Sequence, residues 1–204
     1  MARKKVNSSS GRTDRVIHSS WRGRPYTRAY PETVSNPNTK AQQAHRNAFV
    51  ALSRLASYMK EGHQIGLQYQ AVRMNLNTFC AFKKLNSGLV KADRIDYQHL
   101  YLSKGPVSGV RVTGVRIEEQ HLKLTFIDRY MTQDEADDNF YLYAYCENLC
   151  EGELYGPVFR RDGTIDAIIP TEWNGLKIHL YCYLIDAKSR SSDTVYAILD
   201  EWNI

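Results

Sequence analysis

Basic and aromatic side chains are interleaved near the start of this 204-residue chain. Residues 1–46 hold ten Lys and Arg against Asp14 and Glu32, a net charge of +8. Cationic groups bind phosphates or carboxylates, and aromatic rings stack on bases or fill pockets at protein interfaces. The pattern therefore predicts a segment that binds an acidic protein surface or nucleic acid; a solvated tail that only aids solubility is the remaining interpretation. The predicted contact residues are Arg3, Lys4, Lys5, Arg12, Arg15, Trp21, Arg22, Arg24, Tyr26 and Arg28.

Catalytic constellations are missing from the sequence. It contains no phosphate-binding loop, nucleophile elbow, His-Glu-x-x-His motif or dinucleotide fingerprint. The six histidines do not pair at ligand spacing, and Cys146 and Cys150 lack the second half of a zinc site, so the four cysteines are predicted to be free buried thiols. We therefore expect a protein that is not an enzyme and that uses no metal, cofactor or small-molecule substrate.

One dense acidic cluster comprises Asp134, Glu135, Asp137 and Asp138. It lacks the glycine and the terminal glutamate of a calcium-binding loop. We interpret it as a solvated turn between strands, with weak divalent-cation binding as the alternative.

A second group of aromatic residues lies far along the chain, at every other position of two alternating segments. Tyrosine suits half-buried surfaces, because its ring packs while its hydroxyl stays in water. Three interpretations are open: cross-strand ladders on an outer sheet face, a protein interface, or a stacking platform for bases or sugars. The local charge is acidic, which disfavours nucleic acid here. The residues concerned are Tyr141, Tyr143, Tyr145, Tyr181 and Tyr183.

The charge of the chain is divided unevenly between its halves. Residues 1–104 carry 18 basic and 5 acidic residues, and residues 105–204 carry 9 and 17, so net charges of +13 and −8 give the overall +5. Such asymmetry predicts different partners for the two halves or head-to-tail contact between copies, unless the halves neutralise each other within one molecule. No apolar run approaches the about 18 residues of a membrane helix, and the N-terminus is not a secretory signal. We expect no membrane contact.

Periodicity divides the chain into three parts. Residues 1–37 are predicted to be an extended basic arm with a β-hairpin, formed by Val16–Trp21 and Tyr26–Tyr30 around Gly23. Residues 38–104 are predicted to be a helical hairpin and linker, with one helix from Thr39 to about Gly62 and another from about Ile65 to Leu85.

Residues 105–204 change to a period of two, with about seven short strands and turn signals between them. This spacing is typical of an immunoglobulin-like or fibronectin-like antiparallel β-sandwich. The predicted fold class is α+β.

Particular strings resemble a known family. The segments Ser20–Tyr26 (Ser-Trp-Arg-Gly-Arg-Pro-Tyr) and Asn36–Phe49 (beginning Asn-Pro-Asn-Thr-Lys-Ala-Gln-Gln) resemble a domain of unknown function widespread in Bacteroidales genomes and their phages. Shorter similarities follow at Asn77–Phe79, Ile95–Tyr97, Leu102–Pro106 and Pro170–Gly175, so the resemblance spans most of the chain. The longer basic, serine-rich start departs from the pattern. The resemblance implies a fold more than an activity, and it favours a structural phage protein.

The first functional hypothesis is a structural subunit of a tailed-phage virion, such as a ring or head-tail connector component near the portal. Its partners would be copies of itself in a ring-like homo-oligomer and other virion proteins, and it would be assembled in the host cytoplasm. The second hypothesis is a cytoplasmic nucleic-acid-binding protein that uses the basic arm on DNA. A carbohydrate-binding module that uses the tyrosine face is a third and weaker hypothesis.

Overall fold

The chain consists of two compact units, Met1–Thr39 and Lys40–Ile204, in a computed structural model. The residues that the structure describes are 11–21, 23–33, 36–91, 94–127, 132, 135–198 and, for the backbone only, 201–203. Within these ranges no helix is both long enough and apolar enough to cross a membrane.

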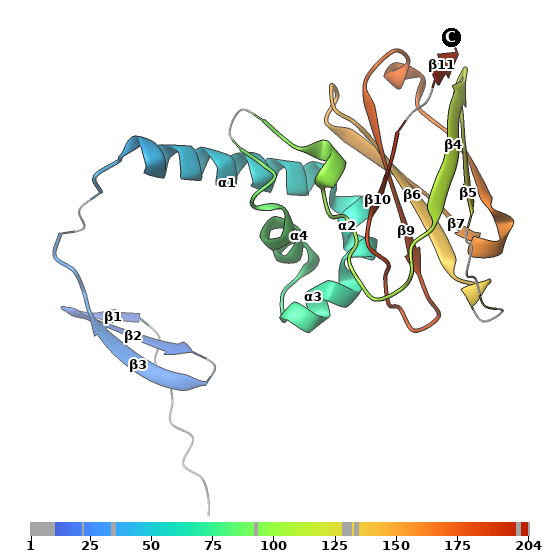
Figure 1. Ribbon diagram of the computed structural model, residues 1–204. Coiled ribbons are helices and arrows are strands. Elements are labelled where there is room, and N and C mark those ends of the chain that lie inside the picture. The colour runs from blue at the N-terminus through green and yellow to red at the C-terminus, as the bar shows by residue number, and fades with distance from the viewer. Residues whose placement is uncertain are drawn as a thin grey trace, which may run out of the picture. The chain divides into compact units, whose positions relative to one another are not determined.

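The N-terminal unit contains a three-stranded antiparallel sheet in the order β1-β2-β3 (Figure 1). Strand β1 is Gly11–Thr13, β2 is Val16–Trp21 and β3 is Arg24–Ala29. The predicted hairpin is thus confirmed, with β1 as an added strand. Gly23 lies between β2 and β3 at φ +76°, a conformation that glycine adopts without steric cost.

Four helices open the second unit: α1 (Lys40–Tyr58), α2 (Lys60–Gly66), α3 (Gln68–Met74) and α4 (Thr78–Asn86). The predicted pair of long helices is wrong in detail. Gly62 lies inside α2 instead of ending a helix, and the second predicted helix is interrupted at Asn75, which has φ +54°. Asn77 then starts α4, because its side chain accepts a hydrogen bond from the Cys80 amide at 2.8 Å.

The sandwich consists of two four-stranded sheets in the orders β10-β9-β6-β7 and β11-β4-β5-β8. All strand pairs are antiparallel except β11 with β4. Hairpins β4-β5 and β6-β7 lie in different sheets, β8 returns to the first and β9 to the second, which is the immunoglobulin-like arrangement. The predicted fold class is confirmed. The strands are β4 (Arg111–Glu118), β5 (His121–Ile127), β6 (Asn139–Cys146), β7 (Glu151–Phe159), β8 (Thr164–Ile168), β9 (Ile178–Ile185), β10 (Val195–Ala197) and β11 (Glu201–Asn203).

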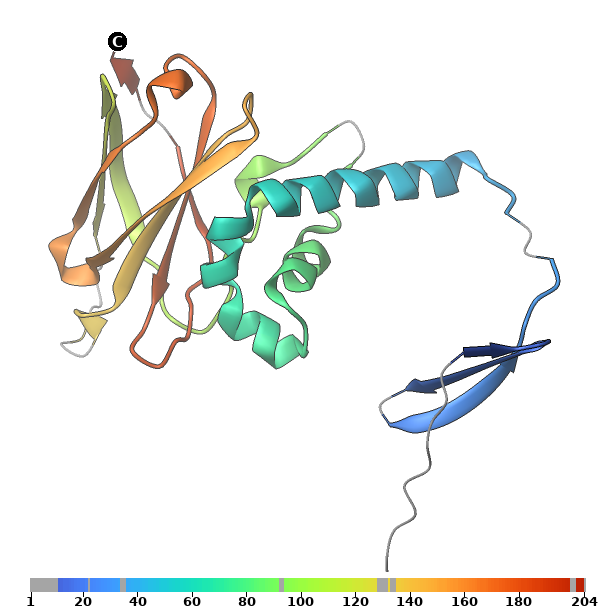
Figure 2. The same ribbon diagram turned by 180° about the vertical axis from the view of Figure 1, so that it is seen from behind.

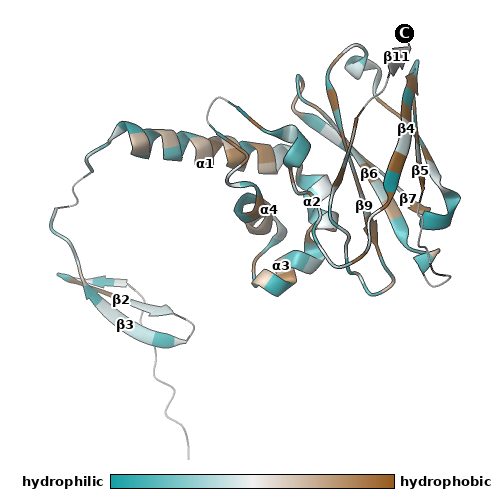
Figure 3. Cartoon of the chain, viewed as in Figure 1, coloured by the Kyte–Doolittle hydropathy of each residue, from teal (hydrophilic) through white to brown (hydrophobic). Residues whose placement is uncertain are grey.

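The helices cover one face of the sheet that contains β6 and β9, so the second unit has three layers (Figures 1 and 2). Every residue of β9 except Ile185 is buried, as are Leu142 to Cys146 of β6. Alternate residues of each strand enter different cores. Leu142 and Leu180 face the other sheet, whereas Tyr143 and Tyr181 face the helices. Figure 3 shows hydrophobic residues running through the sandwich and along the second half of α1.

Candidate partner-binding site

The strand register of the N-terminal sheet gathers its cationic and aromatic side chains on one face. Arg12 on β1 opposes Ile17 on β2, which opposes Arg28 on β3. Residues that oppose each other in an antiparallel sheet point to the same side, and the side chains of a strand alternate between sides. The face that results, here called the basic face, carries Arg12, Ile17, Ser19, Trp21, Arg24, Tyr26 and Arg28.

Among the described strand residues, the opposite face of this sheet carries no Lys, Arg, Asp or Glu. It carries Gly11, Thr13, Val16, His18, Ser20, Pro25, Thr27 and Ala29. The sheet therefore has a sharp difference in charge between its two sides, which the residue order alone does not reveal. That difference depends on the register between β2 and β3, because a slip of one residue would reverse the sides of one strand.

Local contacts fix part of the basic face. The Arg12 guanidinium lies 3.7 Å from the centre of the Tyr30 ring, and its Nε donates to the Asp14 carbonyl oxygen at 2.9 Å. An ion pair of the unit, Arg15 to Glu32 at 3.2 Å, has both side chains at least 70% exposed. Exposed pairs of this kind stabilise by at most about 1 kcal/mol. The contacts orient Arg12, but they leave the unit with little stabilisation of its own.

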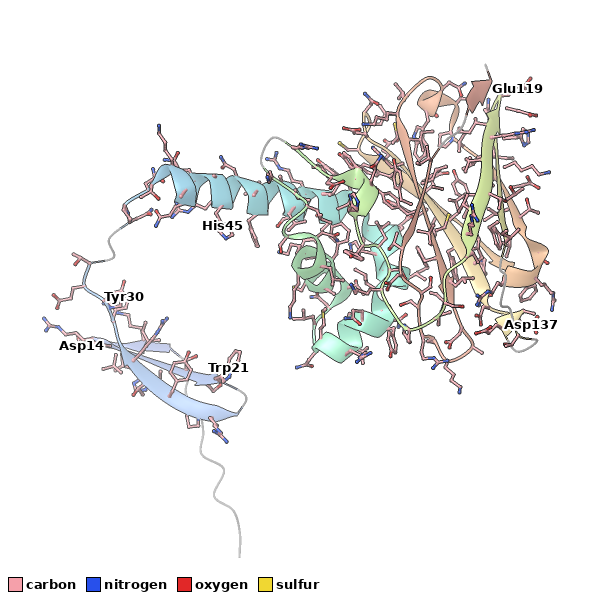
Figure 4. The ribbon with its side chains drawn as sticks, viewed as in Figure 1. Asp14, Trp21, Tyr30, His45, Glu119 and Asp137 are labelled. Carbon is pink, nitrogen blue, oxygen red and sulfur yellow. The ribbon has the colours of Figure 1, made fainter. Side chains whose placement is uncertain are left out.

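Apolar surface on the N-terminal unit remains open to solvent. Trp21 is 68% exposed, Tyr26 46% and Tyr30 38%. The sheet that carries them has no buried residue among those described, and Figure 4 shows the side chains of Trp21 and Tyr30 on it. Uncovered aromatic residues beside arginines are typical of interface centres. The structure thus brings Arg12, Trp21, Arg24, Tyr26 and Arg28 onto one surface.

One further predicted contact residue, Arg15, lies in the turn between β1 and β2 and does not belong to the basic face. The remaining four predicted contact residues lie outside the described residues: Arg3, Lys4, Lys5 and Arg22.

The prediction that these tyrosines lie on an outer face of the sheet is wrong, because the helices cover that face. Tyr143, Tyr145, Tyr181 and Tyr183 are at most 1% exposed. They do form cross-strand ladders, since Tyr141 opposes Tyr183 and their rings stack at 5.7 Å. Three hydroxyls donate to backbone oxygens of the covering segments: Tyr143 to Tyr58 at 3.4 Å, Tyr181 to Tyr97 at 2.9 Å and Tyr183 to Gly62 at 3.0 Å. These four side chains join two layers of one chain, so they offer no surface to sugars, bases or another protein.

A polar cluster that the sequence analysis missed lies under the segment Tyr97–His99 (η1). His179 Nε2 donates to Glu147 at 3.1 Å, and its Nδ1 accepts from the Tyr196 hydroxyl at 2.9 Å. Burial lowers the pKa of His179, more than the neighbouring Glu147 carboxylate raises it. Burial also acts against ionisation of Glu147, but hydrogen bonds from Lys177 and His179 outweigh it and lower that pKa. The arrangement holds a neutral imidazole in one orientation.

The acidic cluster is less solvated than predicted. Asp138 is 4% exposed and pairs with buried Arg160 at 3.0 Å, and Asp137 pairs with Arg161. Burial raises the pKa of Asp138 despite this pair. Asp134 lies outside the described residues. Among the described residues, no three His, Cys, Asp or Glu lie close enough together to hold a metal ion, and all four cysteines are free thiols.

Fold and site together define a class of protein. It is an α+β chain in which an immunoglobulin-like sandwich, covered on one face by helices, follows a small sheet with one basic face. The chain belongs to DUF6266, a family of unknown function, which matches residues 8–197. The expectation of membership in a family without an assigned activity is confirmed. No curated protein matches the sequence.

Proposed function

We propose that this chain is a non-enzymatic assembly subunit whose N-terminal sheet docks on an acidic protein surface. The observation that carries the proposal is the basic face, where three arginines accompany exposed Trp21 and Tyr26 on a sheet with no buried residue among those described. A sheet of this size gains stability when its apolar side chains are buried against another surface. Opposite charge on that surface would set the orientation and speed the encounter.

Within that class we propose a structural subunit of a bacteriophage virion. A ring or head-tail connector component near the portal is the role that the resemblance of Ser20–Tyr26 and Asn36–Phe49 favours. Its neighbours would be further copies of the chain and other virion proteins, in a particle assembled in the cytoplasm of a Bacteroidales-type host. Rings of identical subunits need a heterologous contact that closes on itself, and an arm that reaches the next subunit supplies one.

The test compares the full chain with a chain that lacks residues 1–39. The second unit has two hydrophobic cores of its own and is expected to fold without the first. Mass photometry of both proteins at low and high salt should show oligomers of the full chain, weaker at high salt, and only monomers of the truncated chain. Identical distributions for the two proteins would refute the proposal.

The same face supports a second candidate function, binding of nucleic acid. Arginines with interleaved aromatic residues are also a composition that binds phosphates and stacks on bases. The logarithm of the observed binding constant falls as the logarithm of the salt concentration rises, with a slope of about 0.9 per phosphate contact on duplex DNA. Titration of a fluorescent duplex should therefore show binding that weakens steeply as salt rises. The double substitution Arg24→Glu with Arg28→Glu should abolish the binding. Binding that ignores both salt and these substitutions would exclude this candidate.

A further inference from the structure

We infer that the acceptor for the basic face is the side of the sandwich formed by β7 and β8 on a second copy of this chain. The inference rests on the proposed assembly function and names its partner and surface. That side of the sandwich combines negative charge, open strand edges and exposed apolar residues.

The negative charge of the C-terminal half is concentrated in one stretch. Residues 134–172 hold ten acidic residues against Arg160 and Arg161, a net charge of −8. The rest of residues 105–204 holds seven acidic and seven basic residues. All of the −8 thus belongs to the stretch that contains β6, β7 and β8 together with the loops before, between and after them.

Some of these carboxylates already have cationic partners. Asp138 pairs with Arg160, Asp137 with Arg161, and Glu147 with Lys177 at 2.9 Å. Five others are exposed and make no ion pair within the described part of the chain: Glu151, Glu153, Asp162, Asp166 and Glu172. Of these, Asp166 lies directly opposite Lys123 of β5. The β7–β8 side therefore keeps uncompensated negative charge at Glu151, Glu153, Asp162 and Glu172, as the basic face keeps uncompensated positive charge.

Both strands on this side are the last of their sheets, β7 beside β6 and β8 beside β5. The outer edge of such a strand presents backbone donors and acceptors that another strand can use. The two edges are held together, because the Tyr155 hydroxyl of β7 donates to the Ile168 carbonyl oxygen of β8 at 3.1 Å. Ile168 is 63% exposed and Phe159 44% exposed, so both strands also carry exposed apolar residues.

The N-terminal sheet matches these features. Strands β1 and β3 are likewise open edges, and the six residues of β3 extend about 20 Å, within the about 30 Å of the nine-residue β7. Arg24 and Arg28 lie on the same side of β3, four residues apart. Every copy carries both surfaces, so each arm can bind the next copy head to tail, and such a chain closes as a ring if the rotation allows it.

The test uses two charge-reversed proteins. One carries Arg24→Glu with Arg28→Glu, and the other carries Glu151→Lys with Glu153→Lys. All four residues are exposed, so folding should be unaffected. By mass photometry each variant alone should be monomeric, with self-association weakened at least about tenfold, because like charges now meet. An equimolar mixture of the two should assemble again, since each altered arm meets an altered acceptor and each natural arm a natural one.

A matched control carries Glu118→Lys with Glu119→Lys at the end of β4, a strand that β5 separates from β8 in its sheet. It should assemble like the natural chain. If the acceptor variant and the control assemble equally well while the arm variant stays monomeric, the acceptor is elsewhere and the assembly function survives. If the natural chain is a monomer whose mass is unaffected by deletion of residues 1–39, both proposals fail. Failure of the mixture to assemble would also overturn this acceptor surface.

Discussion

The imidazole of His179 lies flat against the ring of Tyr97, with ring centres 4.2 Å apart and planes inclined by 17°. His179 belongs to β9, and Tyr97 belongs to the η1 segment that follows the helices. The Tyr97 backbone oxygen also accepts the hydrogen bond from Tyr181, and its ring stacks on Tyr145 at 6.0 Å. One residue thus connects the helical layer to two strands of the sheet.

The first prediction concerns this contact. Tyr97→Ala should lower the free energy of unfolding of the second unit by roughly 2–3 kcal/mol, somewhat below the 3–5 kcal/mol of a fully buried aromatic residue. Urea denaturation followed by circular dichroism measures the change. Tyr97→Phe is the control and should stay within about 0.5 kcal/mol of the natural chain, because it keeps the ring. Equal losses from both substitutions would contradict the stacking argument.

The second prediction concerns Gly62. A Cβ there would lie 2.6 Å from Leu102 Cδ2 and 2.8 Å from Tyr143 Cγ, so α2 packs on the sheet only because this residue has no side chain. Although alanine favours helices, Gly62→Ala should destabilise the second unit by about 1–3 kcal/mol through overpacking. The matched substitution Gly88→Ala meets nothing within 4 Å and should be neutral or slightly stabilising. Thermal unfolding of both variants provides the comparison, and a stable Gly62→Ala protein would count against this packing.

The third prediction is a dependence of stability on pH. His63 is 1% exposed, its Nε2 lies 2.8 Å from the Ala56 carbonyl oxygen, and burial lowers its pKa. Since the unfolded chain takes up the proton first, stability should be lost as pH falls below about 6.5. The control, His63→Gln, keeps a donor for Ala56 but cannot titrate. The difference in unfolding free energy between pH 7.5 and 5.5 should be smaller in this variant; an unchanged difference would exclude His63 as a source.

The fourth prediction follows from the division into two units. Deleting residues 1–39 removes neither hydrophobic core, so the urea midpoint and the denaturant slope of the second unit should not change. The backbone amides of the N-terminal sheet should gain protection from hydrogen exchange only when the protein is assembled. A lower midpoint after deletion would mean that the arm stabilises the second unit directly.

The sandwich and the N-terminal hairpin could be predicted from sequence, because their signals are local. The alternation of Leu122 and Leu124 with Lys123 indicates a strand with one solvent-exposed face. Gly23 and Pro25 indicate a turn. The charged composition of the arm is equally visible. Its collection on one face is not, since that requires the register between β2 and β3.

The covering of the tyrosines could not be deduced from alternation alone. An alternation of residue types with a period of two indicates that a strand has two different faces, but it does not indicate what packs against each face. One signal was available, because β6 and β9 have apolar or aromatic residues at almost every position, which is typical of strands buried on both sides. The interrupted helices were missed for a similar reason. Gly62 was interpreted by its backbone freedom, whereas its role is to allow a close approach between distant segments.

Because β6 and β9 are buried on both faces, their register with neighbouring strands is fixed in a different way from that of an ordinary strand. In an ordinary half-buried strand, a shift by one residue brings polar groups into the core, and polarity forbids it. Here a shift would exchange leucines for tyrosines, which are both apolar enough to be buried. The register must therefore be fixed by side-chain size and by the backbone oxygens of Tyr58, Tyr97 and Gly62, which accept hydrogen bonds from the tyrosine hydroxyls. Substitutions that conserve hydrophobicity but alter bulk should be the least tolerated in these two strands.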